Sequence, residues 1–149
     1  MSRIRPVALN DAASLFSIIE EAHRTTSVPF GPAWTLKQVQ EECGQGGLVL
    51  CDADPFSSEV LAFVLYRDVG EALEISFLAT ARNHLGKGHM AELLSSWIKQ
   101  KPESKAIWLE VHEKNVPARK LYEKLGFRES GKRPRYYADG GAAVLYNYG

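Results

Sequence analysis

Apolar residues recur along this chain with two periods, and these predict where helices and strands lie. Near the start, apolar positions three or four apart predict a helix with one buried face: Ala12, Leu15, Phe16, Ile19 and His23. Asn10 stands at the expected N-cap, and Asp11 lies in the first turn, where a negative charge is favourable. A second helix is expected to begin after Thr35 and to run to about Cys43, before the pair Gly46-Gly47.

Short aliphatic and aromatic runs, bounded by Gly, Pro, Asp or Asn, predict strands. Five of them are expected at 4–8, 48–51, 60–66, 72–80 and 106–112. The tail, 127–149, is expected to form a hairpin around Asp139-Gly140-Gly141.

Two more helices are expected in the second half of the chain. Residues 88–99 carry an apolar stripe of Met90, Leu93, Leu94 and Trp97. The last helix is capped by Asn115, has Pro117 in its first turn and ends before Gly126.

The resulting order is β-α-α-β-β-β-α-β-α-β-β. The β-α-β piece in its middle requires two parallel strands and a right-handed crossover, whereas the hairpins around it favour antiparallel neighbours. The expected fold class is therefore α/β (α+β), with a mixed, mostly antiparallel sheet, and the 149 residues suit one domain, 1–149.

Charge and composition narrow the function. Lys plus Arg and Asp plus Glu each number 18, so the net charge of zero gives no general reason to expect nucleic acid or an anionic membrane. The short run of Lys132, Arg133 and Arg135 is either a solvated loop or a small basic patch. Without an apolar leader or a membrane-length apolar run, a cytoplasmic protein with two reduced cysteines and no metal is expected.

A glycine-containing turn, Gly86-Lys87-Gly88, lies between a strand and a helix. Glycines allow close backbone approach, and the helix start offers unpaired N–H groups, which together favour an anion such as pyrophosphate. The alternative is a helix entry that needs glycine for steric reasons alone. The dinucleotide pattern GxGxxG/A also fits through Ala91, but we reject it. Five residues separate the strand from Gly86, and only one βα unit follows.

The strand 106–112 carries ionisable groups on one face. Alternation places Trp108, Glu110 and His112 together, opposite Ile107, Leu109 and Val111. A carboxylate in a central strand is expected to be partly desolvated, which raises its pKa toward the range of a general base. Glu110 is therefore either such a base or a surface charge, and the same choice applies to His112.

Tyr122 lies seven residues after Asn115 and shares its helix face. It belongs to the apolar stripe of that helix, so its ring is expected to be buried. Its phenol could donate a proton to a departing thiolate, or it could be an ordinary core tyrosine.

Taken together, these segments resemble the GCN5-related N-acetyltransferase superfamily. The resemblance rests on Gly86-Lys87-Gly88, Leu109-Glu110-Val111, Asn115 and the run Leu121–Phe127. The run from Trp108 to Phe127, with Trp34-Thr35 and Arg135-Tyr136-Tyr137, is similar to the ribosomal-protein alanine N-acetyltransferases. The element order matches along nearly the whole chain, and the specific motifs cover its second half.

The resemblance implies a V-shaped splay of the fourth and fifth strands that holds acetyl-CoA. The pantetheine arm would pair with Leu78, Ala79 and Thr80 and would contact Asn115. The pyrophosphate would bind the turn formed by Leu85, Gly86, Lys87, Gly88, His89, Met90 and Ala91. Glu110 would be the general base and Tyr122 the general acid, without a metal.

Three differences from the superfamily pattern accompany this resemblance. Leu85 stands where Arg or Gln is usual, which removes a polar side chain beside the phosphates. Met90 replaces Gly or Ala and is expected to crowd the helix start. Gly141 and Ala142 stand where relatives often carry acidic residues before the last strand.

The acceptor site is expected between the 25–34 loop and the tail, with Phe30, Trp34, Tyr136 and Tyr137 as walls. The same side chains could simply pack their loops. The expected acceptor is the amine of a protein or peptide N-terminus, reached by direct transfer in a ternary complex. A small-molecule amine, or a CoA-binding module without catalysis, are the alternatives. A monomer or weak homodimer is expected.

Overall fold

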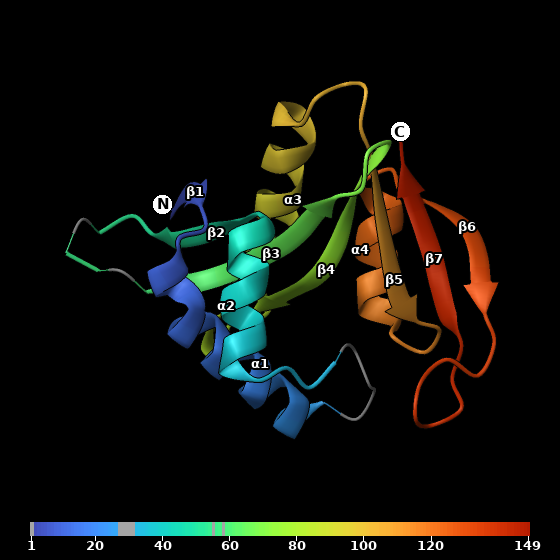
Figure 1. Cartoon of the computed structure of the whole chain (residues 1–149), viewed down its shortest axis with the longest axis horizontal. Coiled ribbons are helices and arrows are strands. Elements are labelled where there is room, and N and C mark those ends of the chain that lie inside the picture. The colour runs from blue at the N-terminus through green and yellow to red at the C-terminus, as the bar shows by residue number, and fades with distance from the viewer. Residues whose placement is uncertain (1, 27–31, 55, 58) are drawn as a thin grey trace.

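The computed structural model describes residues 2–26, 32–54, 56, 57 and 59–149 (Figure 1). Its strands are β1 Ser2–Pro6, β2 Gly47–Asp52, β3 Val60–Asp68, β4 Ala72–Thr80, β5 Ala106–His112, β6 Arg128–Arg133 and β7 Ala143–Tyr148. Its α-helices are α1 Ala12–Thr25, α2 Leu36–Gln45, α3 His89–Gln100 and α4 Val116–Lys124. The described helices include none long and apolar enough to cross a membrane.

The described strands form one seven-stranded sheet in the order β1-β2-β3-β4-β5-β7-β6. β4 and β5 pair in parallel, and the other neighbours pair antiparallel. This topology confirms the expected fold class, including the parallel β4-α3-β5 unit.

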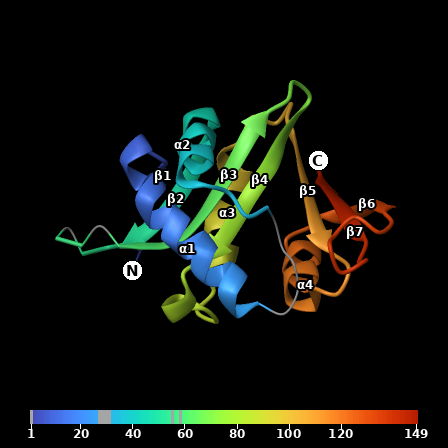
Figure 2. The same ribbon diagram turned by 60° about the horizontal axis from the view of Figure 1, so that its bottom comes forward.

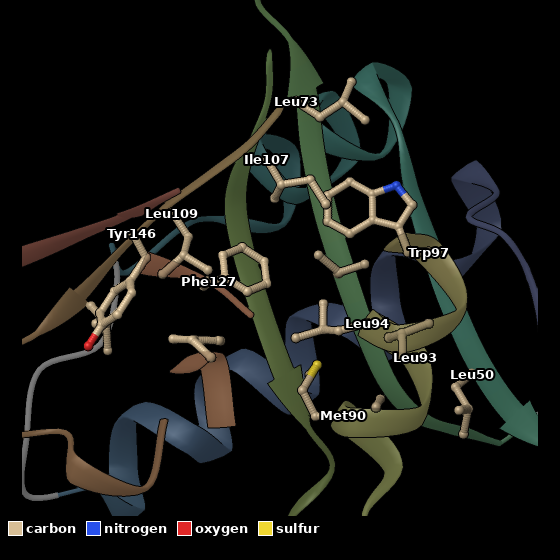
Figure 3. Close-up of a cluster of buried hydrophobic side chains, with 14 of the residues drawn as sticks. Leu50, Leu73, Met90, Leu93, Leu94, Trp97, Ile107, Leu109, Phe127 and Tyr146 are labelled. Atoms are coloured by element: carbon tan, nitrogen blue, oxygen red, sulfur yellow. The ribbon is translucent and has the colours of Figure 1, made fainter. Parts of the chain in front are cut away.

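Each face of the sheet is covered by helices, which gives two buried clusters (Figures 1 and 2). On one face, α1 and α2 pack on β3 and β4 through residues such as Leu15, Val39 and Phe63. On the other face, α3 supplies Met90, Leu93, Leu94 and Trp97, which meet Leu109, Phe127 and Tyr146 from the second half of the chain (Figure 3). The apolar stripe predicted for α3 is confirmed.

The start of the chain differs from the prediction. The first strand lies two residues earlier, and Leu9–Asp11 form a 3-10 turn, so that Asp11 rather than Asn10 precedes α1. The Asp11 carboxylate accepts two hydrogen bonds of 2.8 Å from Arg5 and one of 2.7 Å from the Ala8 N–H. Charge-assisted hydrogen bonds are stronger than those of a neutral cap, which explains why the chain forms this 3-10 turn before α1. The bonds from Arg5 also lower the pKa of Asp11.

The second helix and the last helix begin as predicted. The Thr35 hydroxyl accepts a bond from the Gln38 N–H at 3.2 Å, and the Thr35 N–H donates to the Gln38 side-chain oxygen at 2.7 Å, which together form a capping box. Asn115 caps α4 by accepting from the Ala118 N–H at 3.3 Å. Gly126, with a φ of 102°, follows the end of that helix.

The described residues of β4 and β5 pair at three positions, the last being Glu74 with Trp108. Beyond that point β4 continues beside β3 to Thr80, and β5 continues beside β7 to His112. The two strands therefore diverge, as Figure 2 shows. This divergence confirms the expected V-shaped splay, and it leaves the edge of β4 from Ile75 to Thr80 without a strand partner on the β5 side.

Candidate active site

A cavity of about 1080 Å³ opens where β4 and β5 part. Its walls come from α2, the loop before it, the strands β3 to β7 and the loop between β6 and β7. The lining residues are Pro32, Trp34, Glu42, Arg67, Glu74, Ile75, Ser76, Trp108, Leu109, Glu110, Ser130, Arg133, Tyr136, Tyr137, Ala138, Leu145, Tyr146 and Asn147. The cavity thus brings together Trp34, Glu110, Tyr136 and Tyr137, four of the residues selected from the sequence.

Glu110 lies on β5, two residues beyond the last pair with β4. The alternation predicted for β5 is confirmed, because Ile107, Leu109 and Val111 are buried in the core on the opposite face. The Glu110 side chain keeps 32% of its surface exposed and forms an ion pair of 3.2 Å with Arg133. Its carboxyl group is therefore partly covered and paired with Arg133 in an open cavity.

Tyr122 lies on the other side of β5, in the core beneath α4, and is 4% exposed. Its ring packs against Phe127 and Tyr146, with ring centroids 5.8 and 5.9 Å apart. Burial raises the pKa of its phenol far above the ordinary value, and the nearby Tyr137 and Tyr146 raise it further. Tyr122 is consequently protonated at neutral pH, as a proton donor must be.

His112 is fully buried and holds the loop between β6 and β7 against the end of β5. Its Nε2 lies 2.9 Å from the Asp139 carboxylate, and its Nδ1 accepts a bond of 3.0 Å from the Lys114 N–H. Because Nδ1 is an acceptor, the ring proton sits on Nε2, and this N–H donates a hydrogen bond to the Asp139 carboxylate. The hydrogen bond lowers the pKa of Asp139. Both ring nitrogens are therefore engaged in hydrogen bonds within the protein.

Tyr136 and Tyr137 sit on the loop that His112 anchors. The Tyr137 ring lies 4.8 Å from the His112 ring, and both tyrosine N–H groups donate to the Gly141 carbonyl oxygen, at 3.0 and 3.1 Å. Tyr136 is 50% exposed, and the negative charge of Glu110 raises its pKa. Trp34 forms the facing wall and packs on Phe77, with 5.3 Å between ring centroids. Phe30, also expected there, lies outside the described residues.

The glycine turn precedes α3. Gly86 and Gly88 have φ angles of 75° and 80°, which other residues rarely adopt, and a Cβ on either would meet nothing within 4 Å. The Glu92 N–H donates to the Gly88 carbonyl oxygen at 3.0 Å, so the amides of His89, Met90 and Ala91 before it have no partner within the helix.

The side chains around this turn differ in what they offer. Leu85 is 60% exposed. Met90, which was expected to crowd the helix start, is instead buried in the core below α3 (Figure 3). Lys87 lies 3.4 Å from the Nδ1 of His84, whose Nε2 is 2.5 Å from Glu59. The turn therefore combines free amides with a lysine and no intruding side chain.

Three of the residues expected near a pantetheine arm lie along the splay. Leu78, Ala79 and Thr80 pair with β3 on one side and face the gap on the other. Asn115 uses its amide oxygen to cap α4, and its NH2 group is left as a donor.

Sequence patterns missed several polar residues of the cavity. Glu42 and Arg67 form an ion pair across its wall, although 25 residues separate them in the chain. Ser76 and Asn147 contribute buried polar atoms with no partner among the described residues. The sequence could not indicate that the Ser76 hydroxyl is buried without a partner, because Ser76 lies within a strand that was expected to be regular.

Known proteins resemble this chain in sequence and in fold. Residues 14–127 match the model of the acetyltransferase (GNAT) family. The chain is 30% identical over 139 residues to the [ribosomal protein bS18]-alanine N-acetyltransferase of Haemophilus influenzae, covering 92% of this chain and 88% of that protein.

Solved structures resemble it over almost its full length. The ribosomal-protein-S18-alanine N-acetyltransferase of Escherichia coli superposes with a TM-score of 0.81 at 25% identity, covering 99% of this chain and 93% of that one. NAA60 of Arabidopsis thaliana, in complex with acetyl-CoA, has a TM-score of 0.79 at 16% identity, with 99% of each chain covered. The resemblance expected from the sequence is confirmed, and the chain, an acyltransferase, belongs to the acetyltransferase (GNAT) family.

Proposed function

We propose that this protein, a single catalytic domain, transfers an acetyl group from acetyl-CoA directly to the N-terminal amine of a protein or peptide. The observation that carries the proposal is the gap between β4 and β5, with a carboxylate on one face of the sheet and a protonated phenol on the other. Direct transfer needs a base on the acceptor side and an acid on the side of the leaving thiolate.

The chain offers a suitable place for the coenzyme, which supplies the acetyl group as a thioester. The unpaired edge of β4 at Leu78, Ala79 and Thr80 has backbone groups free to bond an extended amide-containing arm. The amides of His89, Met90 and Ala91, which have no partner within the helix, and the positive end of α3 suit a pyrophosphate. The donor NH2 of Asn115 faces the same arm in this proposal.

Glu110 would take the proton that the acceptor ammonium must lose. In the free protein its counter-ion is Arg133, whose side chain is 57% exposed and therefore easily displaced. An incoming ammonium can replace that guanidinium, so that binding of the charged amine also places it beside the base. Deprotonation then leaves a neutral nucleophile at the mouth of the gap.

Tyr122 would return a proton to the leaving sulfur. Its raised pKa keeps the phenol protonated until a strong base, such as a developing thiolate, is nearby. Unpaired backbone N–H groups on the β4 edge would polarise the thioester carbonyl, because preorganised donors stabilise the oxygen as it gains charge.

The acceptor class rests on the cavity and on the relatives. The cavity has a volume of about 1080 Å³ and aromatic walls from Trp34, Tyr136 and Tyr137, which suit a peptide. Two of the relatives named above, from Haemophilus influenzae and Escherichia coli, are by their names alanine N-acetyltransferases of a ribosomal protein. A free small-molecule amine is the second candidate, because nothing in the wall requires a long acceptor.

Turnover of acetyl-CoA with a panel of N-terminal peptides, followed by intact mass, tests the proposal. Glu110→Gln and Tyr122→Phe should each lower kcat by about 10²- to 10⁴-fold, the usual contribution of a general base or acid. Glu20→Gln, on the exposed face of α1, is the control carboxylate and should behave as wild type. Full activity in both active-site variants would contradict the assigned roles, and thioester binding without turnover on any amine would indicate a binding module.

A further inference from the structure

The hydroxyl of Ser76 is an unexplained polar group at the candidate active site. Its Oγ is buried and has no hydrogen-bond partner among the described residues. Ser76 also lines the cavity at the point where β4 leaves β5. Leaving a buried hydroxyl unpaired lowers stability, so such a group invites an explanation other than folding.

Ser76 occupies a bulge in β4. The neighbouring β3 residues Leu65 and Tyr66 pair with Phe77 and Ile75, so that the residue between these two has no partner on β3. A bulge redirects one side chain of a strand, and bulges are common beside active sites. Here the bulge accompanies the change from a paired strand to a free edge.

The register places Ser76 across the gap from Glu110. Glu74 and Trp108 are the last parallel partners, and Ser76 and Glu110 each lie two residues beyond them, where the strands have parted. Both residues line the same cavity. As the strands diverge, Ser76 and Glu110 therefore stand on opposite sides of the gap, and in the proposed reaction the acceptor amine reaches the thioester between these two residues.

We propose that Ser76 is a positioning residue that accepts a hydrogen bond from the acceptor amine, opposite Glu110. This inference rests on the proposed acetyl transfer. A primary amine that has lost one proton to Glu110 keeps two N–H groups and one lone pair. If the hydroxyl on β4 holds one N–H and the carboxylate on β5 the other, the lone pair points into the gap between the strands. No proton moves to Ser76.

Kinetics of Ser76→Ala on the full-length protein tests this inference. We expect kcat/KM for the acceptor to fall about tenfold, which is the usual contribution of one such bond, while KM for acetyl-CoA is unchanged. The midpoint of thermal unfolding should stay the same or rise, because the variant loses a hydroxyl that has no partner in the free protein. Ser76→Thr keeps the hydroxyl and a strand-compatible side chain, and should restore most of the activity.

Ser17→Ala, on the exposed face of α1, is the matched control. The inference is overturned if Ser76→Ala keeps kcat/KM within twofold of this control. It is equally overturned if the loss comes with a lower unfolding midpoint and a higher KM for acetyl-CoA, since the hydroxyl would then be structural. Full activity of Glu110→Gln and Tyr122→Phe would instead contradict the proposed catalytic roles, so the two failures are distinguishable.

Discussion

Gly141 is the glycine whose replacement should be most damaging to the acceptor side of the site. A Cβ built on Gly141 would lie 2.2 Å from the Nε2 and 2.4 Å from the Cε1 of His112. Carbon contacts are normally about 3.5–4.0 Å, so in Gly141→Ala the ring or the loop must move by more than about 1 Å.

The imidazole of His112 has little freedom to move. It is fully buried, bonded at both nitrogens, and packed against the Tyr137 ring. Overpacking of this kind costs about 1–3 kcal/mol. Loss of the bond from the buried N–H to Asp139 adds about 1 kcal/mol. The free energy of unfolding should therefore fall by about 2–4 kcal/mol, which lowers the midpoint of thermal unfolding by about 5–15 °C for a chain of this size.

Thermal unfolding and steady-state kinetics check this prediction together. Gly44→Ala is the control, because its Cβ would meet nothing within 4 Å and it lies inside α2, so alanine should stabilise the protein by about 0.4–1 kcal/mol. The displaced loop carries Tyr136 and Tyr137, so KM for the acceptor should rise more than KM for acetyl-CoA.

A double-mutant cycle isolates the cause. In a His112→Ala background the obstructing ring is absent, and Gly141→Ala should then cost almost nothing. An unfolding midpoint for Gly141→Ala within about 1 °C of wild type, or an equal cost in both backgrounds, would refute the reasoning.

Two further predictions concern pH and the coenzyme. Burial raises the pKa of Tyr137 to about 12 from the ordinary 10.0, so above pH 10 the unfolded state binds fewer protons than the native state. The free energy of unfolding should therefore fall as pH rises from 10 toward 12, and urea titrations of Tyr137→Phe should give a flatter slope; an equal slope would count against it. Asn115→Asp keeps the oxygen that caps α4 but loses the NH2 donor, so its unfolding midpoint should match wild type while KM for acetyl-CoA rises several-fold. If Asn115→Ala loses stability, Asn115→Asp does not, and both leave that KM unchanged, Asn115 is a cap alone.

Local signals accounted for much of the fold. The bounds of β4 and β5 agree with the prediction because both strands are rich in aliphatic residues and end at polar or turn-forming positions. Thr35 and Asn115 marked helix starts because capping depends on bonds to residues only three positions away. Asn10 was predicted to cap the first helix, but that helix begins after Asp11. The reason is that Asp11 forms charge-assisted hydrogen bonds with Arg5, which are stronger than a neutral cap.

The site was less predictable because its arrangement depends on distant segments. The burial of His112 follows from the loop that carries Asp139, which lies 27 residues later in the chain. The alternation of β5 placed Glu110 and His112 on one face but could not reveal that one is open and the other covered. The bulge at Ser76 arises from pairing with β3, and no local pattern marks it.

The splay also makes β4 an edge strand in the middle of a sheet. Along the described residues Ile75 to Thr80, the backbone groups that face β5 are unpaired, which is the feature through which sheets recruit foreign strands and aggregate. A bound pantetheine arm would occupy this edge like an added strand. Coenzyme should accordingly protect the purified protein against self-association during storage, beyond any effect it has on catalysis.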